Sequence, residues 1–256
     1  MNAAPPFVLP LFDSSSASYW LCSIGEEVRV KTRVNKPGLS AESSRNEAQQ
    51  EPVLFADDVW PGALVLADYL DANAAELCTG KTVLEFGAGG GLPSVVAAKL
   101  GASRVCSTDY PANDVVENIS RQFLANGVPK EVGHALSFSW GSMTQAQAIL
   151  DCLGGRADTI LMAELLWKDT YCLHKELLSS VAATLKRGSG RAILSLTHRP
   201  CPWHTRESDL EFLELAQTDF GFTVTPLGSS SKYADALAGG GGDEQEATFL
   251  YALALP

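Results

Sequence analysis

The sequence predicts an α/β fold, with a seven-stranded, mostly parallel sheet and helices on both of its faces. From residue 57 onward, short runs of β-branched and apolar residues alternate with longer segments of helical periodicity. This alternation is typical of βα units with parallel strands. The last two strand-like segments have no helical pattern between them, which predicts a C-terminal antiparallel hairpin.

The N-terminal part of the chain has a different pattern. Residues 19–34 predict a β-hairpin around Gly25, because the second arm alternates valine and threonine with charged residues. Residues 35–51 are polar and show no apolar period, so we expect a mobile loop. The chain therefore divides into an N-terminal extension, residues 1–56, and a main domain, residues 57–256.

The main domain supplies the seven strands and five helices of the prediction. The predicted strands cover residues 82–87, 104–109, 135–140, 158–166, 190–198, 222–227 and 248–255. The predicted helices lie within residues 57–73, 93–101, 114–127, 170–188 and 206–221. Pro61 suits a first helical turn, and Asp114 with Glu117 resembles a capping box. The Gly/Ser-rich residues 228–247 predict a flexible connection.

Composition narrows the class of protein. The 256 residues carry a net charge of -11, which argues against a general nucleic-acid binder. No apolar run is long enough to span a membrane, and the N-terminus lacks the charged segment of a signal peptide. The six cysteines are scattered, which predicts reduced and mostly buried thiols. We therefore expect a cytoplasmic protein, and a monomer, that binds neither nucleic acid nor membrane.

A glycine-rich turn follows the first predicted strand of the main domain, in the stretch VLEFGAGGGLPS. The dinucleotide pattern G-x-G-x-x-G fails, because its last position is Leu92 when counted from Gly87. The pattern E-x-G-x-G-x-G fits instead, with Glu85, Gly87, Gly89 and Gly91. Glycines allow the backbone to approach a ligand closely, and the acid favours a cationic ligand over a phosphate.

Asp109 ends the next predicted strand, 22 residues after Gly87. A carboxylate there can accept the hydroxyl protons of a ribose, and open α/β sheets bind ligands at the carboxyl ends of their strands. The alternative is a tight turn without a ligand and a helix-capping aspartate. The glycines and the two acids together favour S-adenosylmethionine as the ligand, and argue against NAD.

At these residues the chain resembles the seven-β-strand, Rossmann-like S-adenosylmethionine-dependent methyltransferases. The nearest resemblance is to a fungal group of enzymes that methylate the N-terminus and a nearby lysine of elongation factor 1-alpha. This group is also described as nicotinamide N-methyltransferase-like. The stretches that carry it are VWPGALVLADYL, the glycine-rich segment with RVCSTDYP, VVENI and HRPCPWHTRESDLEFLELA.

The resemblance implies roles for further residues around the cofactor. Trp60 would line its methionine end, unless it is an ordinary packing residue. Trp140 would lie against the adenine, although Ser139 replaces the acid that usually precedes this Trp-Gly pair. The other residues implied to contact the cofactor are Ala88, Tyr110 and Ala163.

The acceptor site is implied to follow the fourth predicted strand of the main domain. The group carries D-x-x-Y or D-x-x-F there, and this chain has Glu164 and Trp167. Glu164 would orient an amine and take its proton, and Trp167 would wall the pocket. The alternatives are a helix-capping acid and a packing residue. His198 ends the next strand and either orients substrate or hydrogen-bonds the loop.

The first predicted activity is N-methylation of a protein, at a lysine or an α-amino group. Elongation factor 1-alpha is the candidate acceptor that the resemblance implies. Two alternatives remain: methylation of a small amine, and a cofactor-binding module without catalysis. The histidines have no metal-ligand spacing with the cysteines, so we expect no metal.

Overall fold

The computed structural model describes residues 16–31, 59–167, 170–198, 206–233 and 247–256. Its main sheet has seven strands in the order β5-β4-β3-β6-β7-β9-β8. They are β3 (Thr82–Phe86), β4 (Arg104–Asp109), β5 (Gly133–Ser137), β6 (Thr159–Ala163), β7 (Arg191–Thr197), β8 (Thr223–Ser230) and β9 (Thr248–Ala254).

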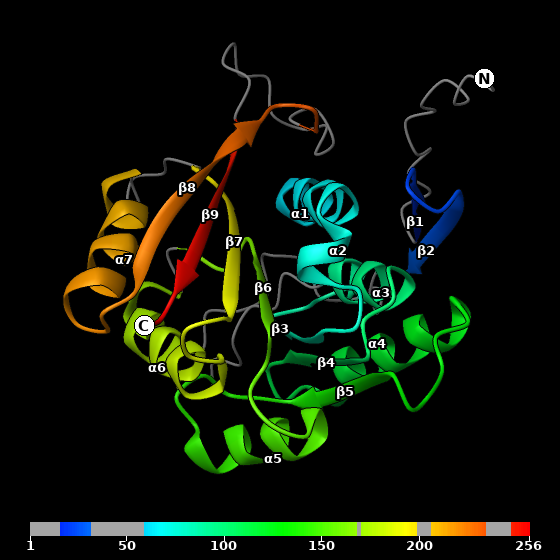
Figure 1. Cartoon of the computed structure of the whole chain (residues 1–256), viewed down its shortest axis with the longest axis horizontal. Helices are drawn as coiled ribbons and strands as arrows, with labels where there is room; N and C mark the ends of the chain where they lie inside the picture. The colour runs from blue at the N-terminus through cyan, green and yellow to red at the C-terminus, as the bar shows by residue number, and fades with distance from the viewer. Residues whose placement is uncertain (1–15, 32–58, 168–169, 199–205, 234–246) are drawn as a thin grey trace, which may run out of the picture.

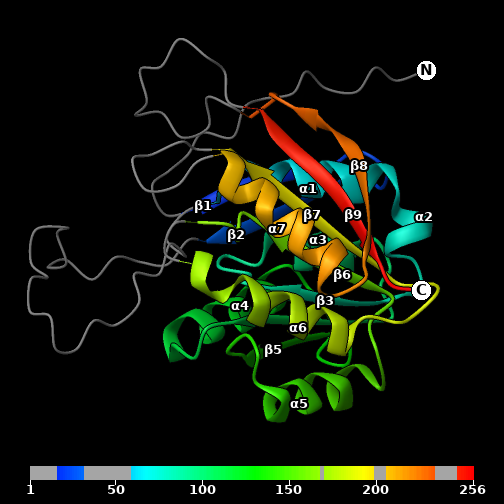
Figure 2. The ribbon, with the colours of Figure 1, turned by 90° about the vertical axis from the view of Figure 1, so that its left-hand side faces the viewer.

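Helices cover both faces of this sheet. They are α1 (Pro61–Ala72), α2 (Ala74–Leu77), α3 (Leu92–Lys99), α4 (Asn113–Ala125), α5 (Met143–Leu153), α6 (His174–Thr184) and α7 (Arg206–Thr218), with a 3-10 turn, η1 (Tyr171–Leu173), before α6. Figure 1 shows α1, α3 and α4 on one side of the sheet and α5, α6 and α7 on the other. In Figure 2, α6 and α7 lie in front of the sheet and α5 lies below them at the bottom of the view.

The pairing of the strands confirms the predicted fold class. β5, β4, β3, β6 and β7 pair in parallel, whereas β9 pairs antiparallel with both β7 and β8. Strand β9 therefore inserts between β7 and β8, and β8 with β9 forms the predicted C-terminal hairpin. The result is a Rossmann-like sheet with an antiparallel edge.

The sheet separates two apolar cores, because neighbouring residues of a strand point to opposite faces. Val83 of β3 packs in the core beneath α1, α3 and α4. The next residue, Leu84, packs in the core beneath α5, α6 and α7. Both side chains are fully buried. A parallel sheet covered on both faces explains why these strands read as continuous apolar runs.

Helix α5 was not predicted from the sequence, although it completes the second helical layer. Ser142 is its N-cap and accepts a hydrogen bond from the Gln145 N–H. Its buried residues, Ala146, Ile149 and Leu153, recur at helical spacing. These signals are present in the sequence, but the polar residues between them make the apolar period weak.

Several predicted boundaries were wrong. Strand β5 ends at Ser137 rather than at residue 140, and β6 ends at Ala163 because Glu164 adopts a left-handed φ of 57°. Strand β8 continues to Ser230 through a bulge, within the predicted connection. The N-cap of α4 is Ala112 rather than Asp114, and the Asp114 carboxylate accepts the Val115 N–H at 3.1 Å from within the first turn.

The predicted N-terminal hairpin is present as β1 (Ser16–Leu21) and β2 (Glu26–Lys31). Its apolar residues, among them Leu21 and Val28, belong to the same buried core as α1 and α3. The predicted boundary at residue 56 and the predicted loop 35–51 lie outside the described residues, as does most of the connection 228–247. The hairpin packs on the main domain and shares its core.

The cysteines agree only in part with the prediction. The five described cysteines are free thiols, but Cys22 and Cys172 are exposed, so the expectation of mostly buried thiols was wrong. Cys201 lies outside the described residues. In the part of the chain that the structure describes, no helix is long and apolar enough to cross a membrane.

Asp68 of α1 holds three chain segments together. Its carboxylate accepts hydrogen bonds from the hydroxyls of Tyr19 in β1, at 2.7 Å, and Tyr233 after β8, at 3.0 Å. Lys232 forms an ion pair with it at 2.7 Å. Both tyrosines are buried, and burial followed by the charge of Asp68 raises the pKa of each phenol.

We expect Asp68→Ala to lower the free energy of unfolding by about 1–3 kcal/mol, because two buried hydroxyls lose their acceptor. Urea unfolding measures this loss. Glu214→Ala, which removes an exposed acid from α7, is the control and should stay within about 0.5 kcal/mol of the unaltered protein. Equal stability of the two variants would contradict the docking role of Asp68.

Candidate active site

The predicted site residues gather at the carboxyl edge of the parallel strands. The turn between β3 and α3 carries Gly87, Gly89 and Gly91, all with positive φ, at 59°, 52° and 73°. Only glycine adopts this conformation repeatedly at low cost. The three glycines therefore form a backbone-lined turn at the start of α3, as the pattern E-x-G-x-G-x-G predicted.

Glu85 lies beneath this turn, inside the protein, and is bonded to the helix that follows it. Its carboxylate accepts hydrogen bonds from the N–H of Ser94, at 3.0 Å, and from the Ser94 hydroxyl, and it is 1% exposed. Ser94 lies in the first turn of α3, so Glu85 ties β3 to the helix that follows the glycines. Burial raises the pKa of Glu85 to about 8, although the bonds from Ser94 oppose this shift.

Asp109 stands beside the glycine turn at the end of β4. Its Oδ2 accepts the Gly89 N–H at 2.7 Å and its Oδ1 accepts the Tyr110 N–H at 2.7 Å. Burial raises the pKa of Asp109, and these two bonds oppose the shift. The structure thus brings together the two sequence signals that are 20 residues apart.

This arrangement fits the expected cofactor. Each oxygen of an ionised carboxylate accepts about two hydrogen bonds, and each oxygen of Asp109 accepts one from the described residues. Asp109 can therefore still accept two ribose hydroxyls. The glycines remove side-chain bulk next to it, and the buried Glu85 supplies an acid on the same turn.

Glu164 is the most constrained residue of the site. It is the only non-glycine residue with positive φ in the described part of the chain. Its Oε1 accepts the Gly62 N–H at 2.9 Å and the Thr197 hydroxyl at 2.7 Å, and its Oε2 accepts the Thr197 N–H at 3.2 Å. The carboxylate therefore joins β6 to β7 and to the start of α1.

Residue 62 has to be a glycine because the Glu164 carboxylate lies so close to it. The sequence alone did not reveal this requirement. A Cβ at residue 62 would lie 2.5 Å from Oε1 of Glu164. The Gly62 carbonyl also accepts the Ser195 hydroxyl of β7 at 2.9 Å. The first turn of α1 is thus bonded on both sides, which places Trp60 at the helix N-cap over the strand ends.

Trp60 and Trp167, which are far apart in the sequence, meet in the structure. Their ring centroids are 5.3 Å apart and the rings are nearly perpendicular, at 72°. Such edge-to-face pairs are favourable by about 0.5–1.5 kcal/mol beyond their burial. Both rings are partly exposed, so the pair forms an aromatic surface beside Glu164.

The other predicted cofactor residues lie around the same edge. Ala163 ends β6 directly before Glu164, and Ala88 lies within the glycine turn and is buried. Tyr110 follows Asp109 and is exposed. Trp140 lies in the loop after β5 and packs partly against the core of α5 to α7. No contact between the described residues tests these four assignments.

His198 has a carboxylate as its observed partner, and this contact tests neither of its two predicted roles. Its Nδ1 lies 2.7 Å from Oδ2 of Asp209 on α7, and its ring lies against Phe249. Both polar side chains of this pair are nearly buried. His198 therefore ties β7 to α7, and Asp209 is a residue that sequence reasoning missed.

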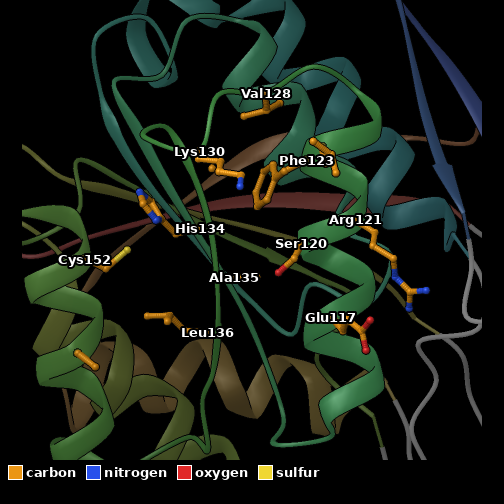
Figure 3. A pocket seen from close by; sticks show the side chains of 13 residues that line it. Glu117, Ser120, Arg121, Phe123, Val128, Lys130, His134, Ala135, Leu136 and Cys152 are labelled. Carbon is orange, nitrogen blue, oxygen red and sulfur yellow. The ribbon is translucent and has the colours of Figure 1, made fainter.

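A separate hollow lies at the outer edge of the sheet (Figure 3). It has a volume of about 650 Å³ and is lined from α4, β5 and α5, with Phe123, His134 and Cys152 among its residues. None of the predicted site residues lines it. Among the described side chains, no three His, Cys, Asp or Glu residues are grouped so that they could hold a metal ion.

The sequence matches a family described as lysine methyltransferase over residues 44–219. Among curated proteins, it is 33% identical to the protein N-terminal and lysine N-methyltransferase EFM7 of Debaryomyces hansenii, covering 68% of each chain. The corresponding protein of Emericella nidulans is 30% identical and is covered to 69%, over 68% of this chain.

Solved structures show the same fold at low sequence identity. A protein from Streptococcus mutans, assigned as a SAM-dependent methyltransferase, matches 76% of this chain with a TM-score of 0.53 and 17% identity. The protein SMU.776, solved with SAH, matches 76% with a TM-score of 0.52 and 19% identity. This chain spans 49% and 50% of these two proteins. From the family match and the geometry of the glycine turn, the chain belongs to the lysine methyltransferase family and is an S-adenosylmethionine-dependent methyltransferase.

Proposed function

We propose that the protein methylates a protein amine, a lysine or an N-terminal α-amino group, at the strand ends beside Glu164. The observation that carries this proposal is a buried carboxylate, Glu164, that is bonded to Gly62, two residues after Trp60, whose ring packs on that of Trp167. A carboxylate attracts an ammonium group, and tryptophan faces bind cations by about 0.5–2 kcal/mol. The names of the fungal relatives support a protein acceptor.

When bound, the cofactor supplies an activated methyl group on its sulfonium. The protein has to bring a neutral amine into line with that methyl group, and such positioning can lower a barrier by about 7–11 kcal/mol. An incoming ammonium must first lose a proton. We propose that Glu164 orients the amine and accepts this proton, while Trp60 and Trp167 enclose it.

Elongation factor 1-alpha is the acceptor we propose, on the basis of the resemblance to the fungal group, which extends beyond the glycine turn to the HRPCPWHTRESDLEFLELA stretch. The test incubates the purified protein with radiolabelled S-adenosylmethionine and whole lysate. We expect label in a protein band of the size of elongation factor 1-alpha, and mass spectrometry should place the methyl groups at its N-terminus and a nearby lysine. Label in the small-molecule fraction alone would support the alternative, a small amine acceptor.

We expect Glu164→Gln to lower kcat by ~10²–10⁴-fold and to leave cofactor affinity nearly unchanged, because the amide keeps the size but cannot take a proton. Turnover and calorimetric binding of S-adenosylhomocysteine measure the two effects. The comparison variant is Thr197→Val, which removes one hydrogen bond to Glu164 and keeps its carboxylate. It should cost stability and much less turnover. A folded Gln variant with normal kcat would remove Glu164 from the chemistry.

We expect binding of S-adenosylhomocysteine to release a proton from Glu85. Its pKa of about 8 means that the carboxyl is mostly neutral at pH 7 in the free protein. The cationic amino group of the ligand favours the ionised form, so its binding lowers this pKa. Affinity should therefore rise with pH up to about 8 and then level off.

Calorimetry in two buffers with different ionisation enthalpies measures this proton release. At pH 7 it should approach about one proton for each ligand bound. The control is Glu85→Gln, which is similar in size and cannot titrate, and which should show no such release. Equal release by both proteins would assign the proton to another group.

A further inference from the structure

One carboxylate oxygen of α6 is buried, and none of the described residues donates a hydrogen bond to it. Glu176 lies in the first turn of α6, and its Oε2 has no partner among the described residues. A buried acceptor that lacks a donor costs free energy, at least about 1 kcal/mol. Such an oxygen has the capacity to accept a hydrogen bond from a further donor.

Glu176 packs directly on the loop that carries Trp140. The Gly141 N–H donates to the hydroxyl of Ser180, one turn further along α6, at 2.8 Å. A Cβ at residue 141 would lie 3.0 Å from Cγ and 3.2 Å from Cβ of Glu176. The side chain of Glu176 therefore covers Gly141, next to the tryptophan that we expect to lie against the adenine.

This loop starts at the level of the ribose carboxylate. Asp109 pairs with Ser137 at the end of β5, and the Phe138 N–H donates to the Asp109 carbonyl at 2.7 Å. Since the adenine is bonded to the ribose, a ribose held by Asp109 brings the base toward one of the neighbouring strand ends. The loop that follows β5 lies at such a strand end.

The same loop lacks an acid of its own for the amino group of the base. Ser139 stands where an acid is usual, and its N–H donates to the side-chain oxygen of Gln145 at 2.7 Å. That oxygen of Gln145 is thus already bonded. A carboxylate is a strong acceptor for the N–H groups of the adenine amino group. Among the described acids, Glu176 is one whose side chain reaches this loop.

We propose that Glu176 accepts a hydrogen bond from the exocyclic amino group of the cofactor's adenine. The inference rests on S-adenosylmethionine as the cofactor and extends the site from the end of β4 to the start of α6. It explains the buried oxygen, and it explains how the site recognises adenine although residue 139 is a serine. Glu176 is thus a binding and specificity residue, remote from the transferred methyl group.

The test compares two ligands by calorimetry: S-adenosylhomocysteine and its analogue with hydrogen in place of the 6-amino group. The analogue keeps the ring nitrogens, so the affinity ratio isolates the amino group. We expect the unaltered protein to prefer S-adenosylhomocysteine by ~10–100-fold, as is typical for a hydrogen bond to a charged group. Glu176→Ala should reduce this ratio to within about threefold, and Glu176→Gln, which keeps a neutral acceptor, should give an intermediate ratio.

Glu214→Ala is the matched control, because it removes an exposed acid from α7, and it should keep the full ratio. If Glu176→Ala does not fold, the Gln variant decides the question by the same ratio. Full discrimination in a folded Glu176 variant would overturn the proposal and leave the cofactor assignment intact. If the unaltered protein failed to bind S-adenosylhomocysteine, the cofactor assignment and this inference would both be wrong.

Discussion

The carboxylate of Glu164 is the contact on which the acceptor half of the site depends. It accepts hydrogen bonds from Gly62 at the start of α1 and from the N–H and hydroxyl of Thr197 in β7. One side chain thereby joins two strands and a helix that come from distant parts of the sequence. The bonds hold Glu164 in a left-handed backbone conformation, which costs about 1–3 kcal/mol for a non-glycine residue. Strain of this kind persists where the surrounding structure enforces it, and it often marks a functional site.

Carboxylates that accept hydrogen bonds from backbone N–H groups also hold the cofactor half of the site together. Glu85 binds the first turn of α3, and Asp109 binds the backbone of the glycine turn and of its own strand end. In each case the carboxylate of an acid satisfies backbone N–H groups that have no partner within a helix or turn. These bonds fix the site before any ligand arrives. A site that is organised in advance loses little free energy in reorganising when charge develops during the reaction.

The strand order divides the edge of the sheet between the two substrates. β3, β4 and β5 carry the glycine turn, Asp109 and the Trp140 loop, whereas β6 and β7 carry Glu164 and His198. Because β3 pairs with β6, the two halves meet at the centre of the sheet. Open α/β sheets bind ligands at this kind of position, where the chain reverses the direction in which strands are added. A methyl donor and an amine can therefore approach each other there without a separate domain.

The sequence by itself determined the order of the strands and of five helices, the glycine turn and the acid at the end of β4. These are local signals, because apolar period, glycine spacing and strand-end acids are read within one element or between neighbours. It also placed Glu164 and Trp167 at one strand end.

The sequence did not reveal α5, whose apolar period is weak. It also placed the ends of β5, β6 and β8 wrongly, since sheet pairing and the conformation of Glu164 set these ends. Only the tertiary structure decided the partners of these side chains: Gly62 and Thr197 for Glu164, Ser94 for Glu85, and Asp209 for His198. Such partners are 9 to 102 residues apart, and their contacts arise when helices pack on the sheet, so no local pattern of the sequence encodes them.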